Sequence, residues 1–317
     1  MPEGKLVPMC YSSQIAAAYQ QYLKLTGATI DFDQFRELYG FRNSDASIRF
    51  PRAVDRWFNE PQNADERSLK ALVDQNRAEA IAKLEGEIFV QRKRLADAER
   101  RLQTRPTKAA SESRRIAGDK IEATLGRLAR LKATQPHPSD ARIFPMHFAP
   151  IVVQDGERRV VRLARYHCRQ AGKPASIDRK FPGLYNARRN NLEKFWRLEF
   201  GYSHAVMLVE SFYENVDRDG RNAVLHFVPR PADTMLVACL FSQWADPAGG
   251  APLLSFAAIT DDPPPEVVAA GHDRMIVNLR PEHLEAWLTP AGRPLPELQA
   301  ILSDRQAPYY EHEVLAA

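Results

Sequence analysis

The chain has 317 residues, 44% of them hydrophobic, and its 44 Lys and Arg against 40 Asp and Glu give a net charge of +4. This length and composition indicate a globular protein that buries a core, as one large domain or two small ones. The longest apolar runs, 205–209 and 235–240, are far shorter than the roughly 20 residues of a membrane helix, so we expect no membrane span.

The three cysteines, Cys10, Cys168 and Cys239, are too few for a disulfide framework, and their number is odd. Residues 1–8 lack the apolar stretch of a secretory signal. We therefore expect reduced thiols and a cytoplasmic, nucleoid-associated location.

Positive charge is concentrated in the middle of the chain. Residues 158–197 hold twelve Lys or Arg and two acids, whereas residues 261–317 hold ten acids and four arginines. Such a segment can attract nucleic-acid phosphates, but a set of unrelated solvated side chains gives the same pattern.

The first 63 residues predict two helices and a loop. Residues 13–26 have helical spacing of apolar side chains and are followed by Gly27. Residues 31–38 predict a second, short helix, and residues 41–63, rich in Arg, Pro and Asn, predict a loop or extended segment.

Residues 64–133 predict an antiparallel helical hairpin. Ile81, Ile88, Leu95 and Leu102 are spaced by seven, as on an amphipathic helix, and Pro106 interrupts the pattern before it resumes around residue 111. We interpret the hairpin as an insertion in a domain that spans residues 10–317. It is either a solvated coiled-coil arm without chemistry or an arm that binds a protein partner or a second copy.

From residue 141 onward the pattern changes to short β-like runs separated by turns. The expected strands are 160–164, 204–209, 223–228, 235–241, 253–259 and 275–279, with helical pieces at 190–200 and 281–288. Short strands with few intervening helices predict an antiparallel sandwich or open barrel with flanking helices. The fold class is therefore α+β.

The sequence contains no zinc-ligand spacing, phosphate-binding loop or dinucleotide fingerprint, so we expect neither a metal nor a cofactor. Four short segments stand out instead: Met9-Cys10-Tyr11-Ser12, Tyr185-Asn186-Ala187-Arg188-Arg189, Glu210-Ser211-Phe212-Tyr213-Glu214 and Gly271-His272-Asp273-Arg274-Met275. In this order they resemble the SOS-response-associated peptidase (SRAP) family over residues 9–60 and 140–290.

The resemblance implies an α/β domain on antiparallel strands that binds single-stranded DNA and forms a thiazolidine with the aldehyde of an abasic site. Carried over to this chain, it assigns catalytic roles to Cys10, Asn186, Glu214 and His272, and a DNA-backbone contact to Arg188. The chain also departs from the family pattern, with Asn215 in place of Trp, Ile276 in place of Pro, and residues 165–168 in place of Trp-Gly-Leu-Ile. It resembles a divergent branch.

The chemistry can be argued from the residue types. An N-terminal Cys has an α-amine and a thiol that are both partly deprotonated near neutral pH, so the amine can form an imine and the thiol can close a ring on it. Glu214 and His272 are candidates for the accompanying proton transfers. Asn186 can position the amine and the sugar hydroxyls without adding charge.

The basic segment supplies candidate DNA contacts. Arg188, Arg189 and Arg165 can neutralise phosphates, and Tyr166 is one of several interleaved aromatic residues that could stack on bases. Any of these aromatic residues could instead belong to the core.

Cys10 can act in this way only if residues 1–9 are absent or removed, because an amide nitrogen forms no imine. Translation from Met9 with loss of the initiator Met, or autoproteolysis between Met9 and Cys10, would expose it. We predict an abasic-site crosslinking protein with autoprocessing and possible lyase activity. The alternatives are a Cys-dependent peptidase and a non-enzymatic nucleic-acid-binding protein whose hairpin recruits a partner.

Overall fold

The computed structural model describes residues 12–45, 47–218, 221–247 and 249–315. The helical and N-terminal elements come first in the chain: β1 (Ser12–Ile15), α1 (Tyr19–Thr26), β2 (Thr29–Ile30), α2 (Phe32–Phe41), α3 (Arg52–Asp55), η1 (Arg56–Phe58), α4 (Ala64–Thr104), α5 (Lys108–Lys132) and η2 (Pro138–Ala141). The central elements follow: β3 (Arg142–Ile143), β4 (Phe148–Asp155), β5 (Arg158–Tyr166), α6 (Ile177–Lys180), β6 (Asn186–Arg188), η3 (Arg189–Asn191), β7 (His204–Arg218) and β8 (Arg221–Arg230). The last are β9 (Met235–Trp244), β10 (Leu253–Asp261), α7 (Pro265–Ala269), β11 (Met275–Ile276), β12 (Asn278–Leu279), η4 (Pro281–His283), α8 (Leu284–Leu288), α9 (Leu295–Ser303) and β13 (Tyr309–Leu315).

A mainly antiparallel sheet forms the body of the protein. Its strands run in the order β12-β9-β10-β5-β4-β7-β1-β3, and β9 also pairs with β7, so β9, β10, β5, β4 and β7 close into a barrel. The exceptions to antiparallel pairing are the parallel pairs of β10 with β5 and β6, and of β2 with β5. The α+β class with a barrel and flanking helices, predicted from the sequence, is confirmed.

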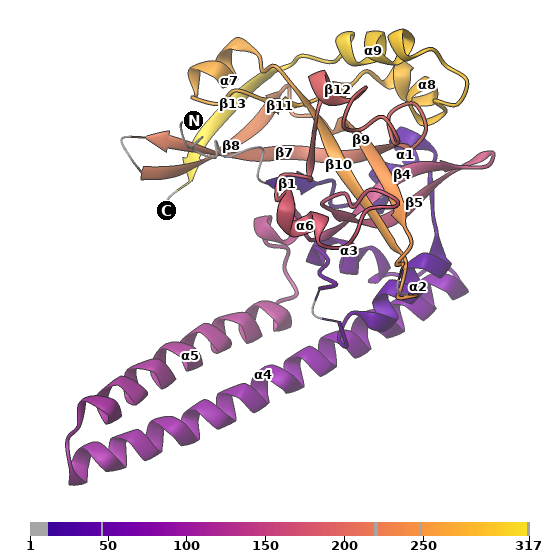
Figure 1. Cartoon of the computed structure of the whole chain (residues 1–317). Helices are drawn as coiled ribbons and strands as arrows, with labels where there is room; N and C mark the ends of the chain where they lie inside the picture. Colours follow the sequence, from indigo (N-terminus) through magenta and orange to yellow (C-terminus); the bar gives the residue numbers. More distant parts are fainter. Residues whose placement is uncertain (1–11, 46, 219–220, 248, 316–317) are drawn as a thin grey trace.

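The interiors of the strands explain why this sheet is stable. Along β4, β5, β7 and β9 almost every side chain is buried, since one face fills the barrel and the other is covered by helices and loops. Helices α7, α8 and α9 lie along one side of the body, and α2 and α3 lie near the base of the helical hairpin (Figure 1). Trp287 of α8 is fully buried, and its indole N–H donates to the carbonyl of Ala205 on β7.

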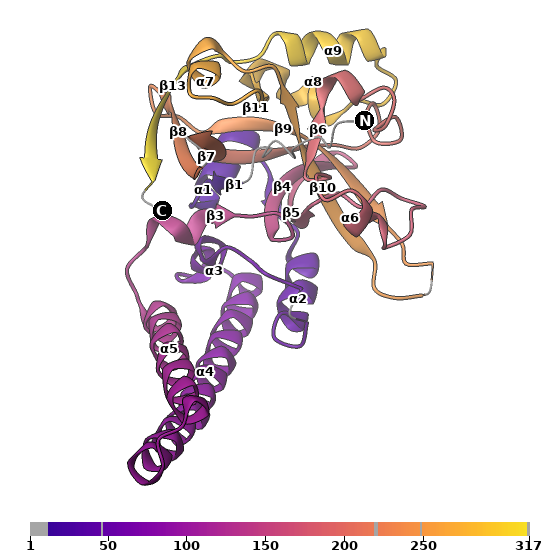
Figure 2. The same cartoon turned by 60° about the vertical axis from the view of Figure 1, so that its left-hand side comes forward.

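The predicted helical hairpin is confirmed. α4 and α5 pack against each other and project from the body as one long arm (Figures 1 and 2). Asn63 caps α4 by accepting from the Glu66 N–H, and Thr107 caps α5 by accepting from the Ala110 N–H. Pro106 lies between the two helices, where its lack of an N–H prevents a continuous helix.

Only the base of the hairpin belongs to the main core. Leu69 and Val73, on the first turns of α4, are part of the core cluster of the body, whereas the buried side chains farther along, such as Leu84 and Ile88, lie outside it. The arm therefore has its own apolar contacts beyond its first turns.

Several predicted boundaries were wrong. Residues 13–15 belong to strand β1 rather than to the start of a helix, because β1 pairs with β7 and β3, and the helix begins only at Tyr19. Residues 41–63 are not all loop, since they contain α3 and η1. Residues 190–200 form the end of η3 followed by turns rather than a helix, consistent with the preference of adjacent Asn190 and Asn191 for turns.

Candidate active site

A carboxylate and an imidazole are enclosed together next to strand β7. The Nε2 atom of His272 lies 3.0 Å from the Oε2 atom of Glu214, and the two side chains are 1% and 0% exposed. A carboxylate without water is strongly destabilised unless a partner compensates its charge, and the His272 imidazole at this distance can do so when it is protonated.

Local structure places the two groups. Glu214 pairs with Leu225 of β8 and lies on the same face of β7 as Phe212, whose ring stacks on Phe227 at 5.0 Å between centroids. His272 follows Gly271, whose φ of 97° is in the left-handed region that glycine adopts at low cost. That turn after α7 directs the His272 ring back toward β7.

Both nitrogens of the His272 ring have polar neighbours. Nδ1 lies 2.8 Å from the carbonyl oxygen of Arg274 and 3.3 Å from its backbone nitrogen, while Nε2 faces Glu214. The ring can therefore carry a proton on either nitrogen and still make hydrogen bonds. This arrangement suits a pair that passes a proton between carboxylate and imidazole.

Strand β10 brings the Asn-Ala-Arg and His-x-Arg-Met segments to one place in the sheet. Thr260 of β10 is opposite Arg188 of β6 on one side and opposite Ile276 of β11 on the other. Asn186 pairs with Ala258, is nearly buried, and its Oδ1 accepts from the Tyr166 hydroxyl at 3.4 Å. Segments about 85 residues apart in the sequence thus flank the same end of β10.

Cys10 lies outside the described residues. The described chain begins with β1, where Ser12 pairs with Tyr213, the residue before Glu214. Ser12 also accepts a hydrogen bond of 3.0 Å from the Nε atom of Arg142. Ser12, the first described residue, therefore lies opposite the β7 position directly before Glu214.

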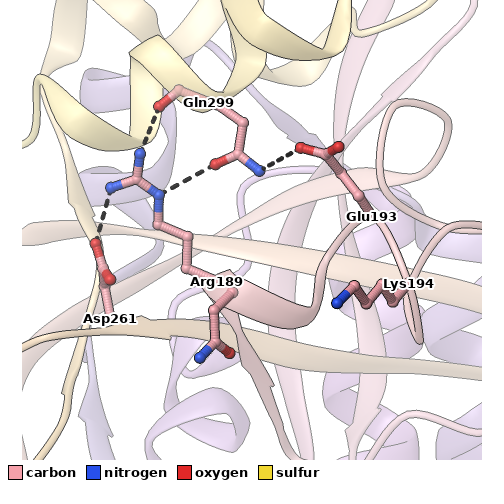
Figure 3. Close-up of a pocket in the computed structure, with 6 residues that line it drawn as sticks. Arg189, Glu193, Lys194, Asp261 and Gln299 are labelled. Carbon is pink, nitrogen blue, oxygen red and sulfur yellow. Dashed lines mark hydrogen bonds and ion pairs between the residues drawn. The ribbon is translucent and has the colours of Figure 1, made fainter.

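The predicted DNA contacts Arg188 and Arg189 occupy different environments. Arg188 is exposed on β6. Arg189 lines a pocket of about 430 Å³ beside α9, where it donates to Asp261 and to the Gln299 side chain and carbonyl (Figure 3). It also donates to the Ser303 hydroxyl. Its charge is already compensated by Asp261, so Arg188 is the more available of the two for a phosphate.

Arg165 and Tyr166 are in the interior of the protein. Tyr166 is fully buried between the rings of Phe256 and Tyr185, and Arg165 is 6% exposed and paired with Asp178 at 2.9 Å. A ring with no exposed face cannot stack on a base, which corrects the expectation of a stacking role for Tyr166 in this conformation. Arg165 likewise presents no charge to solvent.

Two further polar residues at this site were missed by the sequence analysis. The Thr260 hydroxyl and the Nε atom of Arg274 are buried, and neither has a hydrogen-bond partner among the described residues. Arg274 carried a signal, since it belongs to the His-x-Arg-Met segment, whereas Thr260 lies in an ordinary strand pattern and carried none. A buried polar atom without a partner calls for an explanation, and a water molecule or a bound ligand would supply one.

The chain is thus an α+β barrel protein in which Glu214 of β7 and His272 form a buried carboxylate–imidazole pair. A family model described as "SOS response associated peptidase (SRAP)" matches residues 103–316, about two thirds of the sequence, and the chain belongs to this family. The match includes Asn186, Glu214 and His272, whereas residues 9–60 lie outside it. Membership associates the chain with DNA damage and with DNA, in a peptidase-like or DNA-processing role.

Solved structures with a related arrangement include a protein from Bacteroides thetaiotaomicron (16% identity, 56% of this chain and 78% of that one, TM-score 0.47). Another is a protein from Bordetella bronchiseptica (18% identity, 59% and 90%, TM-score 0.46), and a third is a phage-related protein from the same organism (18% identity, 59% and 86%, TM-score 0.43). A search of the curated proteins finds no match. Among the described residues, no helix is long and apolar enough to cross a membrane.

Proposed function

We propose that this chain captures abasic sites in single-stranded DNA by forming a thiazolidine with Cys10 as its N-terminal residue. The observation that carries the proposal is the enclosed Glu214–His272 pair, at 3.0 Å, beside the strand that follows Cys10. A hydrolytic or condensing site needs a group that both takes and gives protons, and this pair supplies one.

The proposed reaction has two steps. The Cys10 α-amine adds to the aldehyde carbon of the ring-opened sugar, and loss of one water gives an imine. The thiol sulfur then bonds to the imine carbon while its proton passes to the imine nitrogen, which closes a five-membered ring. Glu214 would accept and return the proton during water loss, and His272 would protonate the sugar ring oxygen as the ring opens.

Asn186 and Arg188 have supporting roles in this proposal. Asn186 would orient the amine and the sugar through its amide, which adds no charge to an enclosed site. Arg188, exposed two residues later on β6, would contact a backbone phosphate. Because β10 holds both residues in register, the base-free sugar and its phosphate would be positioned together.

Exposure of Cys10 is part of the proposal. Either translation begins at Met9 and the initiator is removed, or the chain cleaves its own Met9–Cys10 bond with Glu214 as the acid and base. The family description favours a peptidase activity, which makes self-cleavage the second candidate function. Incubation of the purified full chain, followed by intact mass measurement, tests this: loss of residues 1–9 in the wild type but not in Glu214→Gln is the expected result.

The main experiment uses intact-protein mass spectrometry. Chain prepared to begin at Cys10 is mixed with a single-stranded oligonucleotide that contains one abasic site, and a heat-stable adduct lighter than the sum by one water is expected. Cys10→Ala and chain that retains residues 1–9 are the controls, and neither should form the adduct. Absence of an adduct from the chain that begins at Cys10 overturns the proposal.

A further inference from the structure

A pocket lies between the base of the helical hairpin and the body, away from the Glu214 site. It has a volume of about 580 Å³ and is walled by α4, α5 and the segments around residues 50 and 144. Apolar side chains form its floor: Phe50, Leu84, Leu131 and Phe144. We call it the hairpin-base pocket. Its size suits a few side chains of a ligand.

Cationic side chains surround this floor. The pocket is lined by five, Arg52, Lys83, Arg127, Arg130 and Arg142, and by only two acids, Glu87 and Asp140, which leaves a surplus of three positive charges. Asp140 is 2% exposed and already contacts Arg56 at 2.7 Å and Arg130 at 3.2 Å. Lys83 is exposed and has no acidic partner within the described part of the chain.

The pocket opens on the other side of the sheet from the Glu214–His272 pair. The Arg142 guanidinium lies over the Tyr213 ring, 3.7 Å from its centroid, and Tyr213 and Glu214 are successive residues of a regularly paired strand. Successive side chains of a strand point to opposite faces. A ligand in the hairpin-base pocket therefore does not compete for the face that carries the buried carboxylate.

An apolar floor with a cationic rim fits an acidic peptide with an apolar side chain better than it fits a nucleic acid. Single-stranded nucleic acid needs an extended basic track with exposed aromatic rings on which successive bases stack, whereas the rings that line this pocket, Phe50 and Phe144, are buried and half-buried. A peptide that places a bulky apolar side chain between carboxylates matches both parts of the pocket. We propose that the hairpin-base pocket binds an acidic peptide segment of a partner protein, anchored by an apolar side chain.

In this proposal the base of the hairpin binds the peptide, and the distal part of the arm is not involved. Leu84 and Lys83 come from α4, and Arg127, Arg130 and Leu131 come from α5, so the pocket exists only because the two helices return to the body together. It does not rest on capture of abasic sites and can be tested with chain that carries Cys10→Ala.

The test is fluorescence polarisation with a labelled synthetic hexapeptide of four aspartates, one Phe and one Leu. We expect saturable binding that weakens as salt rises and at least tenfold weaker binding of a peptide with Asn in place of every Asp. The double variant Lys83→Glu/Arg127→Glu should bind the acidic peptide at least tenfold more weakly. The matched control Lys93→Glu/Lys120→Glu, on exposed positions of the same two helices, should bind it like the wild type.

A second variant and a competitor keep the test decisive. Phe144→Ala removes part of the floor without changing charge and should also weaken peptide binding, with circular dichroism melts to show that each variant is folded. Equal binding of the acidic and neutral peptides, or equal loss in both double variants, overturns the proposal. Displacement of the peptide by an oligonucleotide that itself loses affinity in Lys83→Glu/Arg127→Glu would assign the pocket to nucleic acid instead.

Discussion

The imidazole of His272 and the carboxylate of Glu214 meet at 3.0 Å inside the protein, although 58 positions separate them in the sequence. Glu214→Gln keeps the size of the side chain and one acceptor oxygen, but its amide group cannot take up and return a proton. We expect the rate of adduct formation with abasic oligonucleotide to fall by a factor of about 100 or more. Mass spectrometry of samples quenched at successive times, at several pH values, measures this rate.

Glu210→Gln is the matched control for this substitution, because Glu210 is on the same strand and only partly buried. Its adduct rate should equal that of the wild type. An unchanged rate in Glu214→Gln would remove Glu214 from the mechanism.

Arg188 is predicted to contribute to DNA affinity through charge alone. Arg188→Ala should weaken binding of an intact single-stranded oligonucleotide to a similar degree for every sequence. It should also reduce the slope of log K against log salt by about 0.7, as loss of one phosphate contact requires. Anisotropy titrations at several salt concentrations measure the slope, with Arg114→Ala on the exposed face of α5 as the control. The same slope for wild type and Arg188→Ala would exclude a phosphate contact.

Asp140 is predicted to stabilise the junction of the hairpin with the body. Burial favours a higher pKa for its carboxyl, but the His137 N–H and the guanidinium groups of Arg52 and Arg56 outweigh this, and the pKa is lowered overall. Asp140→Asn should reduce the free energy of unfolding at pH 7 by about 2 kcal/mol. Urea unfolding with a fluorescence readout measures the difference.

The pH dependence of this effect has a definite sign. Because the folded state binds the Asp140 proton more weakly than the unfolded state, the stabilisation is complete above the ordinary carboxyl pKa and is lost as pH falls through the lowered one. The difference in the free energy of unfolding between wild type and Asp140→Asn should therefore become smaller below about pH 4. A gap that stays constant down to pH 3 would contradict the ion-pair explanation.

His204 is predicted to make the protein sensitive to acid. Its Nε2 accepts from the Gly201 N–H, its Nδ1 faces the Trp287 carbonyl, and burial lowers its pKa to about 3. Unfolding frees the ring to bind a proton, so this contribution to stability is complete above the unfolded pKa of 6.5 and is lost between 6.5 and about 3. His204→Gln should be less stable at pH 7 but lose less stability on acidification. Thermal melts from pH 7 to pH 4 give the dependence of the melting temperature on pH for each protein. The same dependence in wild type and His204→Gln would contradict the prediction.

The distal hairpin is predicted to be separable from the body, as expected for an insertion. Replacement of residues 91–121 by a Gly-Asn-Gly turn leaves Glu87 close to Arg127 and Glu85 close to Lys132, and it leaves Leu69 and Val73 in the core. The melting temperature should change by only a few degrees, as measured by calorimetry. Collapse of the folding transition would show that the body depends on the whole arm.

The sequence predicted the parts of the fold whose periodicity is local. Apolar spacing and Pro106 were enough to predict the hairpin, and short apolar runs between turns were enough for β5, β9 and β10. Strand β4 was missed because its buried run gives no alternation and contains Pro150, and β13 was missed because its charged residues resemble a solvated tail. Boundaries near β1 depend on pairing with distant strands, which no local pattern encodes.

The candidate site was predictable only in part. The motifs brought attention to Glu214 and His272, which do meet, but charge density along the chain could not indicate which cations face solvent. Arg165 is 13 residues from Asp178 in the sequence, and only the folded chain brings them to 2.9 Å and removes that charge from the surface. Thr260 became visible only through its unsatisfied hydroxyl.

The two faces of strand β7 border different sites. Tyr213 faces the guanidinium of Arg142 at the hairpin-base pocket, and Glu214 faces His272 on the other side. A slip of one residue in the pairing of β7 would exchange them, placing a carboxylate beside the arginines and an aromatic ring against the imidazole. A single inserted or deleted residue in this stretch would therefore abolish both sites together, although each could be removed alone by substitution.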